Sequence, residues 1–206
     1  MNRFSTRVDD TALVRRIVHY NPWLMRVLTT VRESGLPDAW VGADTVRDLV
    51  WAELYGPGFD PADVPAAEVV FFDPEDISRD RDNGAVELLT GIWSREAGPW
   101  PAPLWRAYNQ AAVHTWYAAK FGGDPIEPLR SIDEAVATWP ETATAVAVQL
   151  DPAGEVRVCA PLGLADLLDG IWRHNPRRVA PDVSRARLAR HRPVERWPGV
   201  RVVEPD

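Results

Sequence analysis

A short apolar run that passes through a Gly-Ala turn directly into a helix constrains the fold more than any other feature. Residues 39–42 have the composition of a buried strand, and residues 45–55 have the apolar periodicity of a helix that Gly56 closes. A second buried strand is predicted at 68–73. Strands and helices that alternate in this way pack as a sheet with helices on its faces. The sequence therefore predicts an α/β (α+β) fold with a mixed β-sheet flanked by helices.

Local capping and turn signals place further elements. Asn21 followed by Pro22 is typical of an N-cap and first helical residue, and Ser131 with Glu134 forms a capping box. Two strands around Pro152-Ala153-Gly154 predict a β-hairpin over residues 144–160. The remaining predicted elements are helices at 13–18, 23–31, 86–93, 109–121, 164–172 and 184–192 and a last strand at 200–203.

Length and composition bound the domain organisation and the partners. With 206 residues, 46% of them hydrophobic, we expect one domain over 1–206, with N-terminal helices in 1–35 and the core and a C-terminal extension in 36–206. The net charge is −7 and no long basic run is present, which predicts that nucleic acid is not a partner. No stretch resembles a signal peptide or a membrane span, so we expect a cytoplasmic protein with no membrane partner and leave its oligomeric state open.

Metal and nucleophile motifs based on histidine or cysteine are not visible. The four histidines are scattered, with no pair at zinc-ligand spacing, and Cys159 lies between apolar residues of a predicted strand. These patterns exclude a catalytic zinc and a cysteine nucleophile. Lys120 is the only lysine beside many arginines, which is typical of a G+C-rich bacterial genome.

Several blocks, taken together and in order, resemble the bacterial nucleotidyltransferase-like family, which was once catalogued as a domain of unknown function and has the polymerase-β-type fold. The matching blocks are 36–51, 66–73, 109–111, 139–146, 160–164 and 197–202. The resemblance covers the chain from about Asn21 onward. It implies a nucleotidyltransferase-like fold for the predicted sheet.

The resemblance also implies a chemistry, metal-assisted nucleotidyl transfer, and Mg²⁺ as the candidate cofactor. In that reaction carboxylates hold Mg²⁺ ions that clamp the attacking and leaving oxygens of a phosphate. Gly42 and Ala43 match the turn where phosphates approach the start of the helix, and are expected to bind substrate. Glu68, Asp44 and Arg47 are the candidate catalytic residues, and Glu68 is the candidate metal ligand.

The chain departs from the family pattern at two positions. Where family members carry Asp-x-Asp, this chain has Ala66-Ala67-Glu68, so one carboxylate is missing and the other is one methylene longer. Where they carry a second glycine, this chain has Asp44, a negative charge at a helix N-terminus that would receive a triphosphate. Both departures predict a weakened two-metal site.

Other roles for these carboxylates stay open. Asp44 could equally be the N-cap of its helix, and Asp60 or Asp63 could replace the lost carboxylate from a loop. Asp73 has the opposite strand parity to Glu68, so we expect it to cap the next turn. Glu155 is a speculative third carboxylate for the metal site.

Polar residues in a later family block are candidate substrate-binding residues. They are Asn109, Gln110 and His114, which could read a base or sugar or could instead cap a helix. Arg47 could pair with a phosphate, with Asp44 or with Glu68. The ten tryptophans are assigned to the core and to pocket walls.

Three functions are compatible with this pattern. We favour the first, in which the family scaffold has a degenerate two-metal site and was recruited to bind or transform a small-molecule ligand. The alternatives are an active Mg²⁺-dependent nucleotidyltransferase and a non-catalytic interaction protein. Because fold does not fix function, whether the chain is an enzyme has to be argued from the site.

Overall fold

The computed structural model describes residues 8–64, 66–95 and 98–204. Its helices are α1 (Val8–His19), α2 (Pro22–Glu33), α3 (Asp44–Tyr55), α4 (Arg79–Arg95), α5 (Val113–Phe121), α6 (Ile132–Val136), α7 (Ala165–Leu168), α8 (Pro181–His191) and α9 (Pro193–Arg196). Its strands are β1 (Trp40–Gly42), β2 (Ala67–Phe71), β3 (Trp105–Asn109), β4 (Ala147–Leu150), β5 (Val156–Cys159), β6 (Ile171–Arg173) and β7 (Arg201–Val203). Short 3₁₀ turns lie at η1 (Pro61–Asp63), η2 (Gln110–Ala112) and η3 (Thr142–Thr144). Among the helices of these ranges, none is long and apolar enough to cross a membrane.

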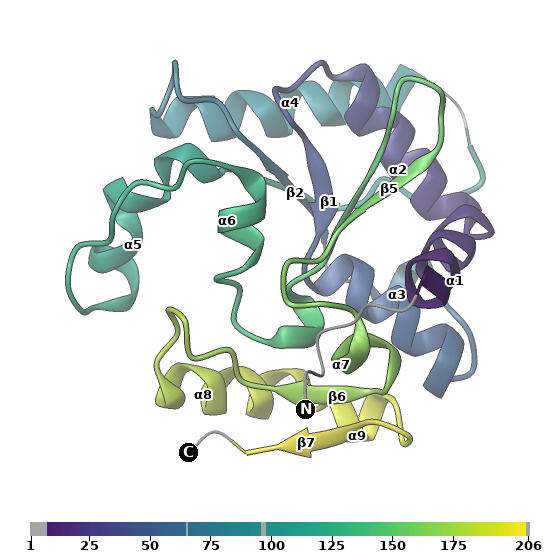
Figure 1. The fold of residues 1–206 in the computed structure, drawn as a ribbon. Coiled ribbons are helices and arrows are strands. Elements are labelled where there is room, and N and C mark those ends of the chain that lie inside the picture. Colours follow the sequence, from purple (N-terminus) through teal and green to yellow (C-terminus); the bar gives the residue numbers. More distant parts are fainter. Residues whose placement is uncertain (1–7, 65, 96–97, 205–206) are drawn as a thin grey trace.

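A five-stranded mixed sheet with the order β3-β2-β1-β4-β5 forms the centre (Figure 1). β1 is antiparallel to both of its neighbours, β2 and β3 are parallel, and β4 and β5 form the predicted hairpin. A second sheet pairs β6 with β7 in parallel, and in Figure 1 it lies below the first sheet together with α8 and α9. The predicted mixed sheet flanked by helices is confirmed.

The two faces of the central sheet have different coverings. Val41, Val69 and Val148 point into the main core, which includes buried residues of α1, α2 and α4. Trp40, Val70 and Ala147 point to the other face, where Ile132 and Val136 of α6 pack against them. Since side chains alternate along a strand, Glu68 shares the face of Val70. The sequence therefore places a carboxylate on the less covered face of the sheet.

The predicted N-caps at Asn21 and Ser131 are confirmed, but the reciprocal bond of the predicted capping box is not formed, because the Glu134 carboxylate accepts from the Arg130 N–H at 2.9 Å and not from that of Ser131. The Asn21 side chain accepts a hydrogen bond from the Leu24 N–H at 2.8 Å, with Pro22 in the first turn of α2. The Ser131 hydroxyl accepts from the Glu134 N–H at 3.1 Å and begins α6. Each bond satisfies an N–H group that a helix start leaves without a partner inside the helix.

Three predictions of secondary structure are wrong. Residues 105–109 form β3, although Asn109 was assigned to a helix, and this helix begins only after η2. The predicted helix 164–172 ends early, and β6 follows from Ile171. Helix α4 begins at Arg79, seven residues before the predicted start at Val86. β3 and β6 each pair in parallel with a strand distant in sequence, so no hairpin signal marks them.

Gly42 is required at the end of β1 by close packing rather than by its backbone angles. A methyl group at this position would lie 2.6 Å from Cη2 of Trp139 and 3.0 Å from Cβ of Ala147. Trp139 is a partly buried cavity wall packed against the same face of the sheet, so its ring would have to shift to admit the methyl group.

We therefore expect Gly42→Ala to lower the free energy of unfolding by about 1–3 kcal/mol, the usual effect of overpacking. Gly91→Ala on the exposed side of α4 is the matched control, because nothing lies within 4 Å of the added methyl. That control should gain up to about 1 kcal/mol, since alanine favours a helix interior. Urea unfolding of both variants measures the difference, and equal stability of the two would contradict the packing explanation.

Candidate functional site at the start of helix α3

The turn from β1 into α3 is strained at Ala43. Its φ of 54° and ψ of −129° lie outside the favoured regions for a residue with a side chain. The Ala43 N–H donates to the Val146 carbonyl at 3.2 Å, which ties the turn to the start of β4. Rare backbone geometry of this kind concentrates at functional sites and persists only where neighbours hold it.

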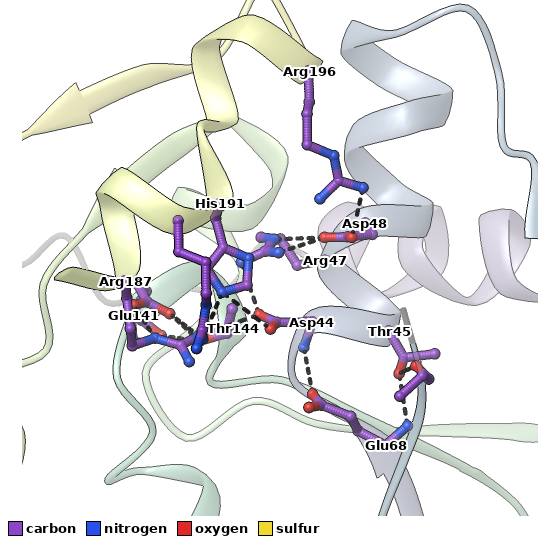
Figure 2. A network of polar contacts seen from close by, with 12 residues as sticks. Asp44, Thr45, Arg47, Asp48, Glu68, Glu141, Thr144, Arg187, His191 and Arg196 are labelled. Carbon is purple, nitrogen blue, oxygen red and sulfur yellow. Dashed lines mark hydrogen bonds and ion pairs between the residues drawn. The ribbon is translucent and has the colours of Figure 1, made fainter. Parts of the chain in front are cut away.

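Asp44 is the first residue of α3 and not its N-cap, so the alternative of an N-cap role is wrong. The N-cap position is Ala43, whose own side chain forms no capping hydrogen bond. The Asp44 carboxylate instead faces cations: its Oδ1 lies 2.9 Å from Arg47 and 3.3 Å from Arg187 (Figure 2). His191 Nε2 lies 3.6 Å from the other oxygen. Arg187 and His191 belong to helix α8, which the sequence pattern could not bring to this turn.

The Glu68 carboxylate lies at the N-terminus of α3. Its Oε2 accepts a hydrogen bond from the Asp44 N–H at 3.1 Å (Figure 2). Thr45 fixes this arrangement: its hydroxyl donates to the Ala66 carbonyl at 3.2 Å and accepts from the Glu68 N–H at 2.9 Å. A helix start attracts anions through its free N–H groups and its dipole. Here a side chain of the same protein supplies the anion.

Arg47 is fully buried behind the turn. Its guanidinium pairs with Asp44 and also with Asp48, whose Oδ1 accepts from Nε at 2.9 Å. The rings of Trp51, Trp172 and Trp197 lie 5.1 to 5.7 Å from its Cζ. Of the three partners considered for Arg47, the structure therefore shows Asp44. Arg47 neutralises two buried carboxylates and does not line the pocket described below.

Glu141 and Arg187 belong to the same network and were not identified from the sequence. Glu141 is fully buried and accepts from Nε of Arg187 at 2.7 Å, while Thr144 Oγ1 lies 3.2 Å from its other oxygen. Arg187 thus joins Glu141 to Asp44 (Figure 2). The only local signal was the single acidic residue of the block 139–146. Nothing in the sequence pattern linked that block to an arginine of α8.

Burial and neighbouring charges shift the pKa values at this site in opposite directions. For Asp44, burial alone would raise the pKa, but Arg47, Arg187 and the other nearby bases outweigh it and lower the pKa to about 2. Burial, followed by the charge of Asp44, raises the pKa of Glu68 to about 7. Burial also lowers the pKa of His191 to about 4, despite the nearby Asp44. At neutral pH the Asp44 carboxylate is therefore charged and His191 is neutral.

A cavity of about 250 Å³ opens in front of this turn. Ala43, Asp44 and Glu68 contribute to its wall on the side of the sheet. Rings supply much of the rest, and three basic side chains reach it. The rings are those of Tyr108, Trp116, Tyr117, Phe121 and Trp139, and the bases are Lys120, Arg178 and Arg187. A cavity lined largely by apolar and aromatic groups with a few polar side chains is the usual form of a small-molecule site.

The structure brings together some of the predicted substrate-binding residues. Gln110 lines the cavity with Ala43, whereas Gly42 lies behind Trp139. Asn109 is fully buried and structural: its side chain donates to the carbonyls of Asp73 and Asp76. His114 lies on α5 and does not line this cavity.

The acidic residues considered as replacements lie elsewhere. Asp60 caps η1 through the Ala62 N–H at 2.9 Å, and Asp63 belongs to the same turn. Glu155 belongs to the hairpin turn, where its N–H donates to Asp151. Asp73 accepts from the Glu75 N–H at 3.2 Å, which confirms the expected turn-capping role.

The residues at the turn do not fit a Mg²⁺ site. Within the ranges that the structure describes, no group of three or more His, Cys, Asp or Glu side chains is placed to hold a metal ion. Asp44 is already paired with Arg47 and Arg187, and Glu68 with a main-chain N–H. A divalent cation between these carboxylates would be repelled by the guanidinium groups beside Asp44. We therefore derive no reaction step through a metal.

A comparison with models of protein families shows which family the chain belongs to. A family model described as "Nucleotidyltransferase" matches residues 29–202. The chain belongs to the nucleotidyltransferase family. No curated protein sequence matches this nucleotidyltransferase-family chain.

Solved structures share its fold. The protein described by "The NMR structure of the protein reveals a CCA-adding enzyme head domain" is 23% identical, with 97% of this chain and 99% of that chain covered at a TM-score of 0.76. The Thermotoga maritima CCA-adding enzyme complexed with tRNA is 14% identical, with a TM-score of 0.51. A CCA-adding enzyme in complex with CTP is 13% identical, with a TM-score of 0.52. Alignments with the last two cover 95% of this chain but only 42% and 43% of those enzymes.

The tRNA complex contradicts our exclusion of nucleic acid as a partner. An enzyme with this fold is complexed with tRNA, so the fold is compatible with nucleic acid. The exclusion rested on the net charge of the whole chain and on the lack of a long basic run. Such averages overlook local clusters, and arginines are concentrated here between residues 173 and 201.

Proposed function

We propose that this nucleotidyltransferase-family chain binds a small molecule that has a planar ring and an anionic group, by a mechanism that does not need the family's metal pair. The observation that carries the proposal is the 3.1 Å hydrogen bond from the Asp44 N–H to the Glu68 carboxylate. A phosphate bound at the start of α3 would need that N–H group. Glu68 would have to move or take up a proton before a phosphate could enter.

Two other bases that line the cavity, Arg178 and Lys120, are better groups for an anion. Arg178 lies 5.3 Å from the Tyr117 ring, and Lys120 lies 5.3 Å from the Trp116 ring. Neither base forms an ion pair with an acidic residue in the part of the chain that the structure describes. A ring stacked against Tyr117 or Trp116 would place its charged substituent beside these bases. Arg187, by contrast, is already engaged by Glu141 and Asp44.

An active Mg²⁺-dependent nucleotidyltransferase is the second candidate. Membership of the family favours it, and a CCA-adding enzyme of the same fold has been solved in complex with CTP. Nucleotides are therefore the appropriate first probes, because they contain both a planar ring and an anionic group. The two candidates differ in whether a metal ion and a triphosphate improve binding.

The test is titration calorimetry of the full chain with AMP, CMP, ATP and CTP, each in Mg²⁺ and in EDTA. We expect EDTA to change the affinity by less than about twofold, triphosphates to bind no more tightly than monophosphates, and Arg178→Ala to weaken binding by about tenfold, or about 1.4 kcal/mol. Arg185→Ala, on the exposed side of α8, is the control and should bind like wild type.

Two results would overturn the proposal. Tight triphosphate binding that requires Mg²⁺, with release of pyrophosphate, would establish an active transferase. If none of the four nucleotides binds to the folded chain, the small-molecule proposal fails and a non-catalytic interaction protein becomes the better account.

A further inference from the structure

The side-chain amide of Gln110 is a buried polar group with an unused acceptor. Gln110 is 6% exposed and lines the cavity at α3. Its Nε2 donates to the Tyr108 carbonyl at 3.3 Å. Its Oε1 accepts no hydrogen bond from any residue that the structure describes, and it is not sealed off from solvent. Because buried polar groups are rarely left without partners, this oxygen is placed to accept from a molecule in the cavity.

The main chain holds the amide of Gln110 in one orientation. A carbonyl oxygen can only accept a hydrogen bond, so the Tyr108 carbonyl attracts Nε2 and repels Oε1. Turning the amide over would bring two acceptors together. The group that Gln110 leaves free for a ligand is therefore an acceptor, and the ligand has to provide the donor.

The backbone around Gln110 is fixed by the fully buried Asn109. The Asn109 Oδ1 accepts from the Ala111 N–H at 3.1 Å and from the Asp73 N–H at 3.0 Å. The Asn109 N–H donates to Asp82 Oδ1 at 2.7 Å. A group that is held in place before binding loses little freedom when a ligand arrives, so its hydrogen bond contributes more to affinity.

Other polar groups of the cavity are engaged or have the opposite character. The Thr138 hydroxyl donates to the Ala135 carbonyl at 2.7 Å, and the Thr144 hydroxyl donates to the Glu141 carbonyl at 2.9 Å. The basic side chains that line the cavity can only donate. Gln110 therefore adds an acceptor to a cavity whose cations recognise the anionic group of the ligand.

We infer that Gln110 selects ligands whose planar ring carries an amino group, which donates a hydrogen bond to Gln110 Oε1. Glutamine makes the same kind of contact with the amino group of adenine in protein–DNA complexes. The inference rests on the small-molecule function proposed above and adds the chemical class of the ring. A ring whose edge offers no donor would leave Oε1 without a partner and would bind more weakly.

The test is titration calorimetry of the full chain with pairs of ligands that differ only in the amino group. AMP is paired with the purine ribonucleoside monophosphate that has hydrogen in place of the amino group, and CMP with the corresponding pyrimidinone ribonucleoside monophosphate. The sugar, the phosphate and the ring skeleton are the same within each pair. We expect the amino-bearing ligand of each pair to bind about tenfold more tightly.

Gln110→Leu removes the acceptor and keeps a side chain of similar size. This variant should bind AMP about tenfold more weakly and the purine analogue as wild type does, so that the preference disappears. Gln149→Leu is the matched control, because it makes the same substitution on β4 and outside the cavity. The control should keep the full preference for AMP, and melting curves check that both variants are folded.

The side-chain ¹⁵N resonance of Gln110 gives a second measurement on wild type that does not depend on a variant. It should shift on addition of AMP and much less with the purine analogue. Equal binding within the ligand pairs, equal shifts with both ligands, or a preference that survives in Gln110→Leu would overturn the inference and leave the small-molecule function standing. If no nucleotide binds to the folded chain, that function fails and the inference fails with it.

Discussion

Replacing Arg47 with methionine is expected to lower the free energy of unfolding by about 3–5 kcal/mol, the range for breaking a buried ion pair from one side. Arg47 is fully buried and neutralises both Asp44 and Asp48. Methionine has a similar length but no charge, so two buried carboxylates would lose their main partner. Arg187 and Arg196 contact these carboxylates as well, but each is partly exposed.

Urea unfolding at neutral pH measures this loss. The control is Glu195→Gln, which removes an ion pair between two exposed side chains, Arg192 and Glu195, and should cost less than about 1 kcal/mol. Adding Asp48→Asn to Arg47→Met should recover part of the loss, because one of the unpaired charges is removed. A loss for Arg47→Met no larger than that of the control would show that the pair does not stabilise the turn.

Glu68→Gln is expected to make the protein more stable than wild type at alkaline pH, by about 1–3 kcal/mol. Burial and Asp44 raise the pKa of Glu68 to about 7 from an ordinary 4.5. The folded protein therefore holds the proton more tightly than the unfolded chain does, and wild type loses stability as the pH rises from about 4.5 through 7. Glutamine does not ionise, so the variant escapes this loss.

The pH dependence distinguishes this effect from a general change in packing. The two proteins should have similar stability near pH 4, and the difference should grow until about pH 8 and then level off. Glu155→Gln in the exposed hairpin turn is the control and should follow wild type at every pH. Urea unfolding from pH 4 to 9 provides the comparison, and a difference that does not vary with pH would refute the role of the Glu68 charge.

The elements that could be predicted from the sequence are those that local patterns specify. The turn at Gly42 and the caps at Asn21 and Ser131 involve residues close in sequence, and the β4–β5 hairpin joins neighbouring strands. Strand β3 could not be recognised in this way, because it pairs with the distant parallel strand β2. A long-range pairing leaves no periodic signal of its own.

The same division explains the site. Glu68 and Asp44 were identified because they lie within the strand-turn-helix segment, and the structure places the Glu68 carboxylate against the Asp44 N–H. The role of Asp44 as an N-cap was wrong, because Arg47 and Arg187 attract its carboxylate away from the helix N–H groups. Arg187 reaches Asp44 only after α8 packs against the turn, and that contact depends on the whole fold.

The ¹⁵N shift of the Asp44 amide, followed by NMR from pH 4 to 9, tests most directly whether Glu68 occupies the anion position at the start of α3. The amide donates to the Glu68 carboxylate, so its shift should follow the ionisation of Glu68, with a midpoint at about pH 7. The same titration should disappear in Glu68→Gln. If the Asp44 amide instead shows no change near pH 7 and shifts on addition of Mg²⁺ and CTP, then the N-terminus of α3 is open to a phosphate and the account given for this site is wrong.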